Sequence, residues 1–122
     1  MPKILIVDDD VSITELLKAL VSMGGHQPTT VNDSTKAIEV ATSVHPDLIT
    51  LDLMMPGLTG FELCDLLHND PEFANIPIVI ISARDDRESK DKAIEMGAKD
   101  YITKPFGVEE LINKIKMLTA EY

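Results

Sequence analysis

The sequence is poor in cysteine and in positive charge. Its single cysteine, Cys64, excludes an internal disulfide, and the apolar stretch around it favours a buried thiol that behaves as a small hydrophobe. Lys and Arg number 11 against 21 Asp and Glu, which gives a formal net charge of −10 at pH 7. Proteins that bind nucleic acid directly need a basic footprint to displace counterions from phosphates. The charge therefore argues against direct contact with nucleic acid and against binding to anionic membrane surfaces.

Long hydrophobic runs are also missing. No stretch of about 18 apolar residues suggests a membrane span, and the opening MPK, followed by a strand pattern, lacks the features of a secretory signal. We therefore expect a cytoplasmic location. The three histidines, His26, His45 and His68, show no spacing typical of metal ligands, and each lies beside Gly, Pro or Asn. We expect them to be structural or to face solvent.

The sequence does contain a regular alternation of two patterns. Its 122 residues suit one compact domain, in which five short runs with strand character alternate with five helical patterns. The expected strands cover residues 3–7, about 27–31, 47–51, 77–82 and 99–103. The expected helices begin near residues 12, 32–34, 59, 87 and 108, and they end near residues 24, 45, 69, 96 and 120. Turn residues mark each change of pattern.

This alternation predicts the fold class. Central strands that read as continuous apolar runs, such as residues 78–81, are typical of a parallel sheet with helices on both faces. We therefore predict an α/β fold with one doubly wound, five-stranded parallel sheet, a flavodoxin-like (βα)5 arrangement with strand order 2-1-3-4-5. In this order the first and third strands are neighbours where the winding reverses, and ligands bind beyond their carboxyl ends.

Polar and charged residues follow four of the expected strands at this edge. The first strand ends in Asp8, Asp9 and Asp10, the third in Asp52 and the fourth in Ser82, and the fifth leads to Lys104. Carboxylates that converge there repel by several kcal/mol at an effective dielectric constant of about 20, so they need a counter-charge or raised pKa values. Oxygen ligands without a nearby His or Cys suit Mg²⁺ better than Zn²⁺. Asp52 as nucleophile, with Ser82 and Lys104 beside it, would make an aspartyl-phosphate site.

Each of these residues has a simpler interpretation when it is taken alone. An aspartate after a strand is more often a turn former or a helix N-cap, Ser82 a loop hydroxyl and Lys104 a solvated charge. The combination favours a site, because the acids, the hydroxyl and the lysine follow different strands and fall on one edge.

The same segments resemble those of a known family, the receiver domains of two-component response regulators. The resemblance rests on ILIVDDD, LDLMMPGLTGFEL, IVIISA and GAKDYITKPF, and it covers essentially the whole chain. It implies one receiver domain over residues 1–122, with no output domain in this chain. By position it assigns the acidic pair to Asp8 and Asp9, the phosphoacceptor to Asp52, the hydroxyl to Ser82, the switch aromatic to Tyr101 and the phosphate-binding lysine to Lys104.

The resemblance also implies a cofactor, Mg²⁺. Asp9, Asp52 and the backbone carbonyl of Met54 would ligate the ion directly, and Asp8 would act largely through water. The peptide bond between residues 104 and 105 resembles one that is usually cis in the family.

The function that the resemblance implies is a phosphorylation switch. A sensor histidine kinase or a phosphotransfer protein would donate a phosphoryl group from a phosphohistidine to Asp52. Ser82 and Tyr101 would then couple the site to the surface made by the fourth helix, the fifth strand and the fifth helix. A downstream protein, a fused output domain or a second copy of the chain would bind there. We expect the domain to catalyse its own phosphorylation and the hydrolysis of its acyl phosphate, and not to be an enzyme. Met54 and Arg84 would control the access of water, so we do not expect fast hydrolysis.

Other kinds of protein share parts of this pattern. An aspartate-nucleophile phosphatase of the haloacid dehalogenase type needs a second acid at position 54, where this chain has Met54. A flavin or nucleotide module would need a phosphate loop after the first strand, where three aspartates would repel phosphate. A receiver-like interaction module that works without phosphorylation would be expected to lack part of the acid, hydroxyl and lysine set. Tyr101 could, without the resemblance, be an ordinary strand residue.

Three local features outside the site pattern can also be predicted. Asp10 is expected to lead into the first helix, where the positive end of the helix dipole favours its charge. Ser12 and Glu15 have the spacing of a capping box, and Glu88 and Lys92 have the spacing of an i,i+4 ion pair.

Overall fold

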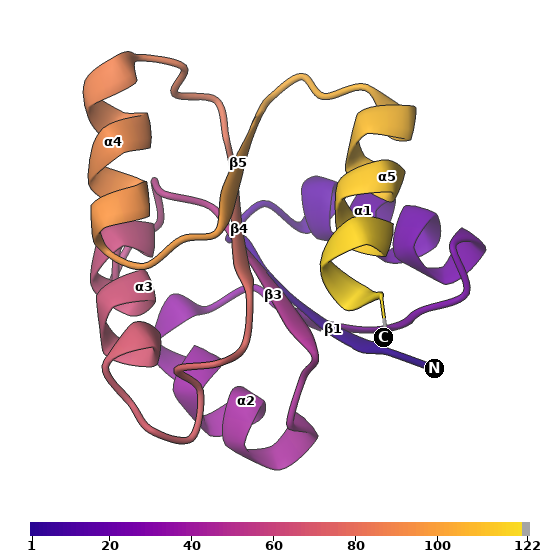
Figure 1. Cartoon of the computed structure of the whole chain (residues 1–122), viewed down its shortest axis with the longest axis horizontal. Helices are drawn as coiled ribbons and strands as arrows, with labels where there is room; N and C mark the ends of the chain where they lie inside the picture. The colour runs from indigo at the N-terminus through magenta and orange to yellow at the C-terminus, as the bar shows by residue number, and fades with distance from the viewer. Residues whose placement is uncertain (121–122) are drawn as a thin grey trace.

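The chain folds around one parallel sheet, as the sequence predicts (Figure 1). The computed structural model describes residues 1–120. The strands, which lie in the order β2-β1-β3-β4-β5, are β1 (Lys3–Val7), β2 (Gln27–Val31), β3 (Leu48–Leu51), β4 (Ile78–Ser82) and β5 (Asp100–Thr103). The helices are α1 (Val11–Met23), α2 (Ala37–Val44) with a short 3₁₀ turn before it, α3 (Gly60–His68), α4 (Arg87–Glu95) and α5 (Val108–Thr119). The predicted flavodoxin-like fold and strand order are therefore confirmed.

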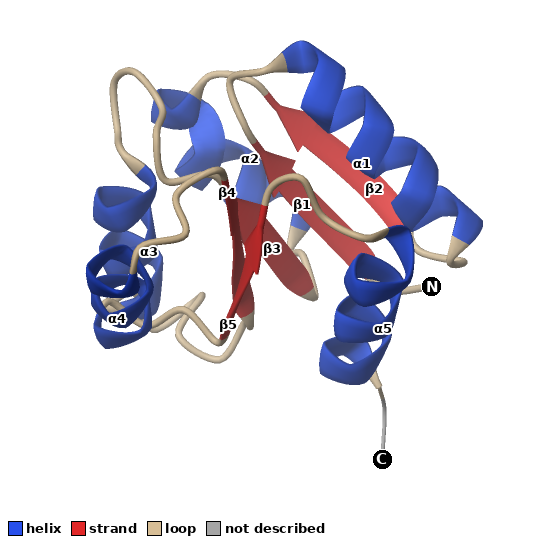
Figure 2. Cartoon of the chain, turned by 90° about the horizontal axis from the view of Figure 1, so that it is seen from above, coloured by secondary structure: helices blue, strands red, loops and turns tan. Residues whose placement is uncertain are grey.

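Helices cover both faces of the sheet (Figure 2). α1 and α5 lie on one face, and α2, α3 and α4 lie on the other. Strand β1 shows how alternation builds both layers. Ile4 and Ile6 pack with α1 and α5, whereas Leu5 and Val7 pack with the other three helices, and none of the four is more than 1% exposed. Both faces of β1 are therefore buried, and its acidic residues lie beyond its carboxyl end.

Asp10 is the N-cap of α1. Its Oδ1 atom accepts hydrogen bonds from the amide of Ser12 at 2.9 Å and from the amide of Ile13 at 3.4 Å. The expectation that Asp10 leads into the first helix is confirmed. The capping box predicted from Ser12 and Glu15 is wrong, because Asp10 already satisfies the first free amides and Ser12 lies inside the helix.

The charged residues of α4 pair differently from the prediction. Within residues 1–120, no ion pair joins Glu88 to Lys92. The Nζ atom of Lys92 lies 4.4 Å from the centre of the Phe61 ring on α3, a distance typical of a cation–π contact. The i,i+4 pair in this helix joins Arg87 to Asp91 at 3.8 Å. The aromatic face on the neighbouring helix therefore competes successfully for the lysine.

The interior and surface follow the expected polarity. Cys64 is fully buried, and burial raises the pKa of its thiol to about 11, in agreement with the buried thiol expected from the sequence.

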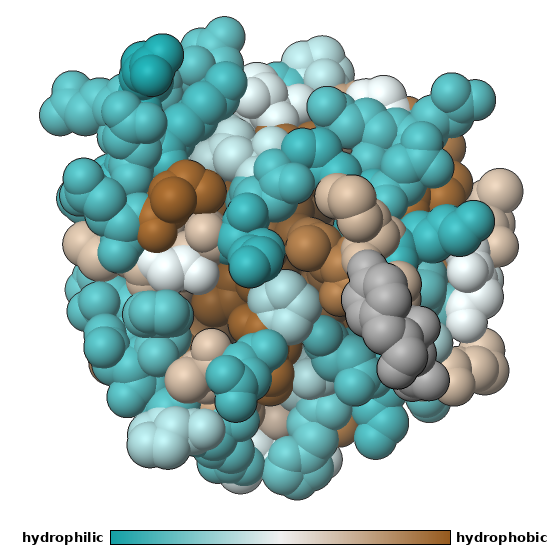
Figure 3. All heavy atoms as spheres, viewed as in Figure 1, coloured by the Kyte–Doolittle hydropathy of each residue, from teal (hydrophilic) through white to brown (hydrophobic). Residues whose placement is uncertain are grey.

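His45 and His68 face solvent, and His26 is half-buried. Hydrophilic residues cover most of the face shown in Figure 3. Among the helices of residues 1–120, none is long and apolar enough to cross a bilayer.

Candidate phosphoacceptor and metal site

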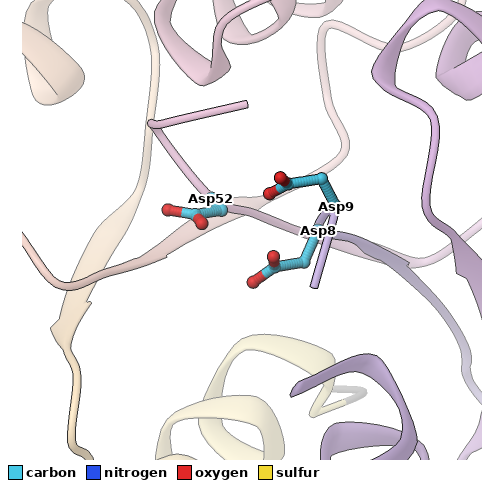
Figure 4. A group of neighbouring side chains, drawn as sticks. All are labelled: Asp8, Asp9 and Asp52. Carbon is cyan, nitrogen blue, oxygen red and sulfur yellow. The ribbon is translucent and has the colours of Figure 1, made fainter. Parts of the chain in front are cut away.

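Three carboxylates meet at the carboxyl ends of two neighbouring strands (Figure 4). Asp8 follows β1 and Asp52 follows β3, and the parallel register pairs Val7 with Leu51 directly before them. Asp8, Asp9 and Asp52 each offer one oxygen atom, and these three atoms lie within 4.8 Å of one another. The sheet order therefore brings together acids that are more than forty positions apart in the chain, as the sequence predicts.

Lys104 supplies a positive charge to this group. Its Nζ atom lies 2.8 Å from Oδ2 of Asp8 and 3.3 Å from Oδ2 of Asp52. Burial alone would lower the pKa of Lys104, but the hydrogen bond to Asp8 and the charges of Asp52 and Asp8 outweigh it, so the pKa is raised. Lys104 is therefore held in its charged form between the carboxyl groups of Asp8 and Asp52. The peptide bond between Lys104 and Pro105 is cis, as the resemblance implies.

Backbone amides hold the two inner carboxylates. The amide of Asp10 donates to Oδ1 of Asp8 at 2.9 Å, and the amide of Met54 donates to Oδ1 of Asp52 at 3.4 Å. Each carboxylate thus has one oxygen bound to the backbone and one bound to Lys104. This orientation leaves both carboxylates in a defined position at the strand ends.

Asn32 is a site-supporting residue that the sequence reasoning missed. Its Nδ2 atom donates to the backbone oxygen of Asp8 at 2.9 Å and to the hydroxyl of Thr14 at 3.0 Å. Asn32 therefore ties the end of β2 to the end of β1 and to the first helix. The position of Asn32 directly after the second strand could have indicated a role at the site. The sequence pattern instead favoured it as a possible start of the second helix.

Gly60 packs closely against the backbone of Asp52 and Leu53. Its amide donates to the carbonyl of Leu53 at 3.0 Å. A Cβ atom at residue 60 would overlap the carbonyl oxygen of Asp52 and would lie 2.6 Å from the Cα of Leu53. Only glycine fits this close approach between the first residue of α3 and the end of β3.

Ser82 and Tyr101 are connected through Arg84. Ser82 is fully buried at the end of β4, and its Oγ atom accepts from the amide of Arg84 at 3.3 Å. The hydroxyl of Tyr101 on β5 donates to the backbone oxygen of Arg84. Burial is the main cause that raises the pKa of Tyr101. The two residues assigned to the switch therefore contact the same loop residue.

Arg84 also reaches the loop that follows Asp52. Its Nη1 atom lies 3.9 Å from Sδ of Met54, and its Nε atom lies 3.3 Å from Oδ1 of Asp86. Asp86 caps α4 by accepting from both the amide and the hydroxyl of Ser89, and these bonds lower the pKa of Asp86 to about 2. One arginine thus connects the loop after β3 with the start of α4.

The donor chemistry of the site fits a hard divalent cation. Carboxylate oxygens, such as those of Asp8, Asp9 and Asp52, are typical Mg²⁺ ligands, and the burial of Asp8 and Asp52 favours a counter-ion. Neither imidazole nor thiolate belongs to this group of ligands, which argues against a Zn²⁺ site.

Comparison with known proteins decides the family. A family model described as the response regulator receiver domain matches residues 4–116. The chain belongs to this family. The predicted membership of the receiver-domain family is therefore confirmed over almost the whole chain.

Individual relatives agree with this assignment. The chain is 39% identical over 118 residues to the DNA-binding dual master transcriptional regulator RpaA of Synechocystis sp., covering 97% of this chain and 49% of RpaA. It is 39% identical over 113 residues to the phosphate regulon transcriptional regulatory protein PhoB of Pseudomonas aeruginosa, covering 93% of this chain and 49% of PhoB. The receiver domain of the Francisella response regulator 1452 superposes with a TM-score of 0.90 and 34% identity, covering 98% and 97% of the two chains. The chain spans about half the length of the curated relatives it matches.

The receiver fold brings together most of the residues that the sequence singled out. Asp8, Asp9, Asp52 and Lys104 form one group, with Asp10 outside it as the helix cap. Ser82 ends the strand next to β3, and Tyr101 lies on the following strand. For Met54 the structure shows an amide contact to Asp52, and its carbonyl remains a predicted metal ligand.

Proposed function

We propose that this receiver domain accepts a phosphoryl group on Asp52. The donor is a phosphohistidine of a sensor histidine kinase or of a phosphotransfer protein. The observation that supports this proposal is the pairing of Lys104 with Oδ2 of Asp52 at 3.3 Å, inside a group of acids that could hold a metal ion. A carboxylate nucleophile and a lysine charge are the parts that phosphoryl transfer needs at one point.

The chain's own residues would position and neutralise the reacting group. An oxygen of Asp52 attacks phosphorus in line with the leaving imidazole, the P–O bond forms, and the P–N bond breaks with its electron pair returning to the imidazole. Lys104, already charged, stabilises the negative charge on the phosphoryl oxygens. Asp9, Asp52 and the carbonyl of Met54 would hold Mg²⁺, with Asp8 acting through water. When bound, this ion would neutralise charge on the transferred group.

The signal would leave the site through two residues. The hydroxyl of Ser82 would donate a hydrogen bond to a phosphoryl oxygen. This bond would draw the loop after β4 inward. Tyr101 would follow, because its hydroxyl is bonded to Arg84 in that loop. The surface made by α4, β5 and α5 would change with it and alter its binding to a downstream protein, to a fused output domain or to a second copy of the chain.

The domain would act as a switch and not as an enzyme with a released product. Water would hydrolyse the acyl phosphate on Asp52 and return the site to its starting state. Met54 and Arg84 flank the site without an acid or amide side chain that positions water, so the hydrolysis would not be fast.

The relatives suggest the kind of protein in which such a domain works. RpaA carries DNA-binding in its name, and each of the two relatives is about twice as long as the matched region. We propose that this domain likewise controls an output carried by a fused domain or a separate partner. With a net charge of −10, the receiver itself would not be the part that contacts DNA. A cytoplasmic location would fit such a role.

Two alternatives have less support. A phosphatase with an Asp52 nucleophile would need an acid where Met54 stands, and a thioether cannot transfer a proton. An interaction module that works without phosphorylation would not require Lys104 to be held between Asp8 and Asp52, as it is here.

Intact mass tests the proposed function. The wild type, incubated with Mg²⁺ and acetyl phosphate as phosphodonor, is expected to gain the mass of one phosphoryl group. Asp52→Asn is expected to gain none, and wild type without Mg²⁺ is expected to gain much less. No metal-dependent gain in the wild type, or an equal gain in Asp52→Asn, would refute phosphorylation at Asp52.

A further inference from the structure

The thioether of Met54 lies beside the phosphoacceptor and is open to solvent. Its side chain is 58% exposed, while its amide donates to the carboxylate of Asp52 at 3.4 Å. Its Sδ atom is 3.9 Å from Nη1 of Arg84. Arg84 belongs to the loop after β4 and is held there by its bonds to Ser82 and Asp86, each 3.3 Å long. An oxidisable sulfur and a positive charge thus face each other from the two loops that border the site.

We propose that Met54 is an oxidation site, and that its sulfoxide binds Arg84 and restricts access to Asp52. The effect on phosphoryl exchange rests on the phosphoacceptor function proposed above. The oxidant is a hydroperoxide such as hydrogen peroxide. A lone pair of the sulfur attacks one peroxide oxygen, the S–O bond forms and the O–O bond breaks. The proton of the transferred oxygen passes to the leaving hydroxide, which departs as water, so sulfur loses two electrons and the peroxide gains them.

Oxidation would strengthen the contact that already exists. A thioether is a weak hydrogen-bond acceptor, whereas a sulfoxide is polar and its oxygen accepts well. The 3.9 Å between Sδ and Nη1 allows an oxygen on the sulfur of Met54 to come within hydrogen-bonding distance of Arg84. Because the donor is a guanidinium, the new bond is charge-assisted. It would join the loops after β3 and β4 across the site.

This bridge would hinder both phosphodonor and water. We expect phosphoryl uptake and hydrolysis each to slow by roughly three- to tenfold, because an exposed bond to a charged group contributes less than a buried one. Met23 and Met117 are also exposed, at 77% and 61%, and would be oxidised too. They lie at the end of α1 and in α5, outside the loops that follow β3 and β4. Met117→Leu therefore serves as the matched control for Met54→Leu.

The test measures how oxidation changes the two rates in each variant. Wild type, Met54→Leu, Met117→Leu and Arg84→Ala are treated with hydrogen peroxide, and peptide mass mapping locates the added oxygen. Acetyl phosphate with Mg²⁺ then loads each protein, and intact mass follows uptake and loss of the phosphoryl group. The ratio of oxidised to untreated rate is expected to fall in wild type and Met117→Leu, and to stay near unity in Met54→Leu and Arg84→Ala.

Several results would overturn the proposal. These are no oxygen on Met54, unchanged rates in the oxidised wild type, faster hydrolysis after oxidation, and an equal slowing in Arg84→Ala. A sulfoxide that speeds hydrolysis would position water instead of binding Arg84. If untreated wild type gains no phosphoryl mass, the phosphoacceptor function itself fails and the effect proposed here fails with it.

Discussion

The ammonium nitrogen of Lys104 lies 2.8 Å from Oδ2 of Asp8, and this contact joins residues 96 positions apart in the chain. The two side chains are only 16% and 3% exposed. Asp8 follows β1 and Lys104 follows β5, and two strands, β3 and β4, lie between them in the sheet. The pair therefore spans the carboxyl edge and encloses Asp52, which follows β3.

Removing the lysine should destabilise the fold as well as the function. Lys104→Met leaves the buried carboxylates of Asp8 and Asp52 without a positive partner, and we expect the free energy of unfolding to fall by about 3 kcal/mol. Urea unfolding in metal-free buffer measures this free energy. Lys114→Met is the control, because Lys114 pairs with Asp100 at the same 2.8 Å but both side chains are more than a quarter exposed. That variant should lose less than about 1 kcal/mol, and equal losses would contradict a special role for Lys104.

The raised pKa of Lys104 also predicts how stability depends on alkaline pH. The folded state binds this proton more tightly than the unfolded chain, in which the pKa is near its ordinary value of 10.5. The stabilisation is therefore fully present below that pH and is lost as pH rises through the higher folded pKa. Urea unfolding between about pH 10 and about pH 12 should show this loss in wild type and a smaller one in Lys104→Met.

Tyr101 must be separated from this effect. Its pKa is also raised above its ordinary value of 10.0, chiefly by burial, so it contributes an alkaline loss of the same sign. Tyr101→Phe removes that part and leaves the part due to Lys104. If Tyr101→Phe abolishes the whole alkaline loss, the attribution to Lys104 is wrong.

The residues of the site could be predicted because their positions follow from the order of the strands. A parallel sheet places every carboxyl end at one edge, so Asp8, Asp52 and Lys104 meet whatever the details of the loops. The contacts that escaped prediction depend on loop conformation. Asn32 reaches Asp8, and Arg84 reaches Met54, only because particular turns direct those side chains.

The error at the start of α1 has a related cause. Two residues near the start of α1, Asp10 and Ser12, carry side chains suited to an N-cap, and sequence spacing favoured Ser12 because Glu15 follows it three positions later. Which residue caps is decided by the path of the chain as it leaves β1. In the same turn the amide of Asp10 donates a hydrogen bond to the carboxylate of Asp8. The helix cap and the acidic site therefore depend on one turn.

Asp9 belongs to the acidic group, whereas Asp10 caps α1, so substitutions at the two positions should have different effects. Asp9→Asn removes a carboxylate from the acidic group, so Mg²⁺ affinity should fall, and stability in metal-free buffer should rise because like charges repel less. Asp10→Ala should keep Mg²⁺ affinity within about twofold but lose about 1 kcal/mol of stability with its cap. Calorimetric titration with Mg²⁺ and urea unfolding measure the two quantities. A loss of Mg²⁺ affinity in Asp10→Ala equal to that in Asp9→Asn would place Asp10 in the metal site.

Gly60 lies directly against the backbone of Asp52, the proposed phosphoacceptor, and its substitution should affect both fold and function. In Gly60→Ala the new Cβ would overlap the carbonyl oxygen of Asp52, and the atoms that would have to move belong to the backbone. We expect a loss of about 3 kcal/mol in the free energy of unfolding. Because a small displacement of a nucleophile is costly, phosphoryl uptake by the folded fraction should fall by about tenfold or more.

Gly107→Ala is the matched control for this prediction, since the nearest atom to its Cβ would be the Cβ of Glu110 at 4.0 Å. Gly107 caps α5 without a side chain, so alanine there should cost less than about 1 kcal/mol and leave the uptake rate within about twofold of wild type. Urea unfolding and the initial rate of mass gain with acetyl phosphate test both variants. If Gly60→Ala folds and is phosphorylated like Gly107→Ala, then α3 can shift away from β3 at little cost. The close packing of the two elements would then not be what positions Asp52.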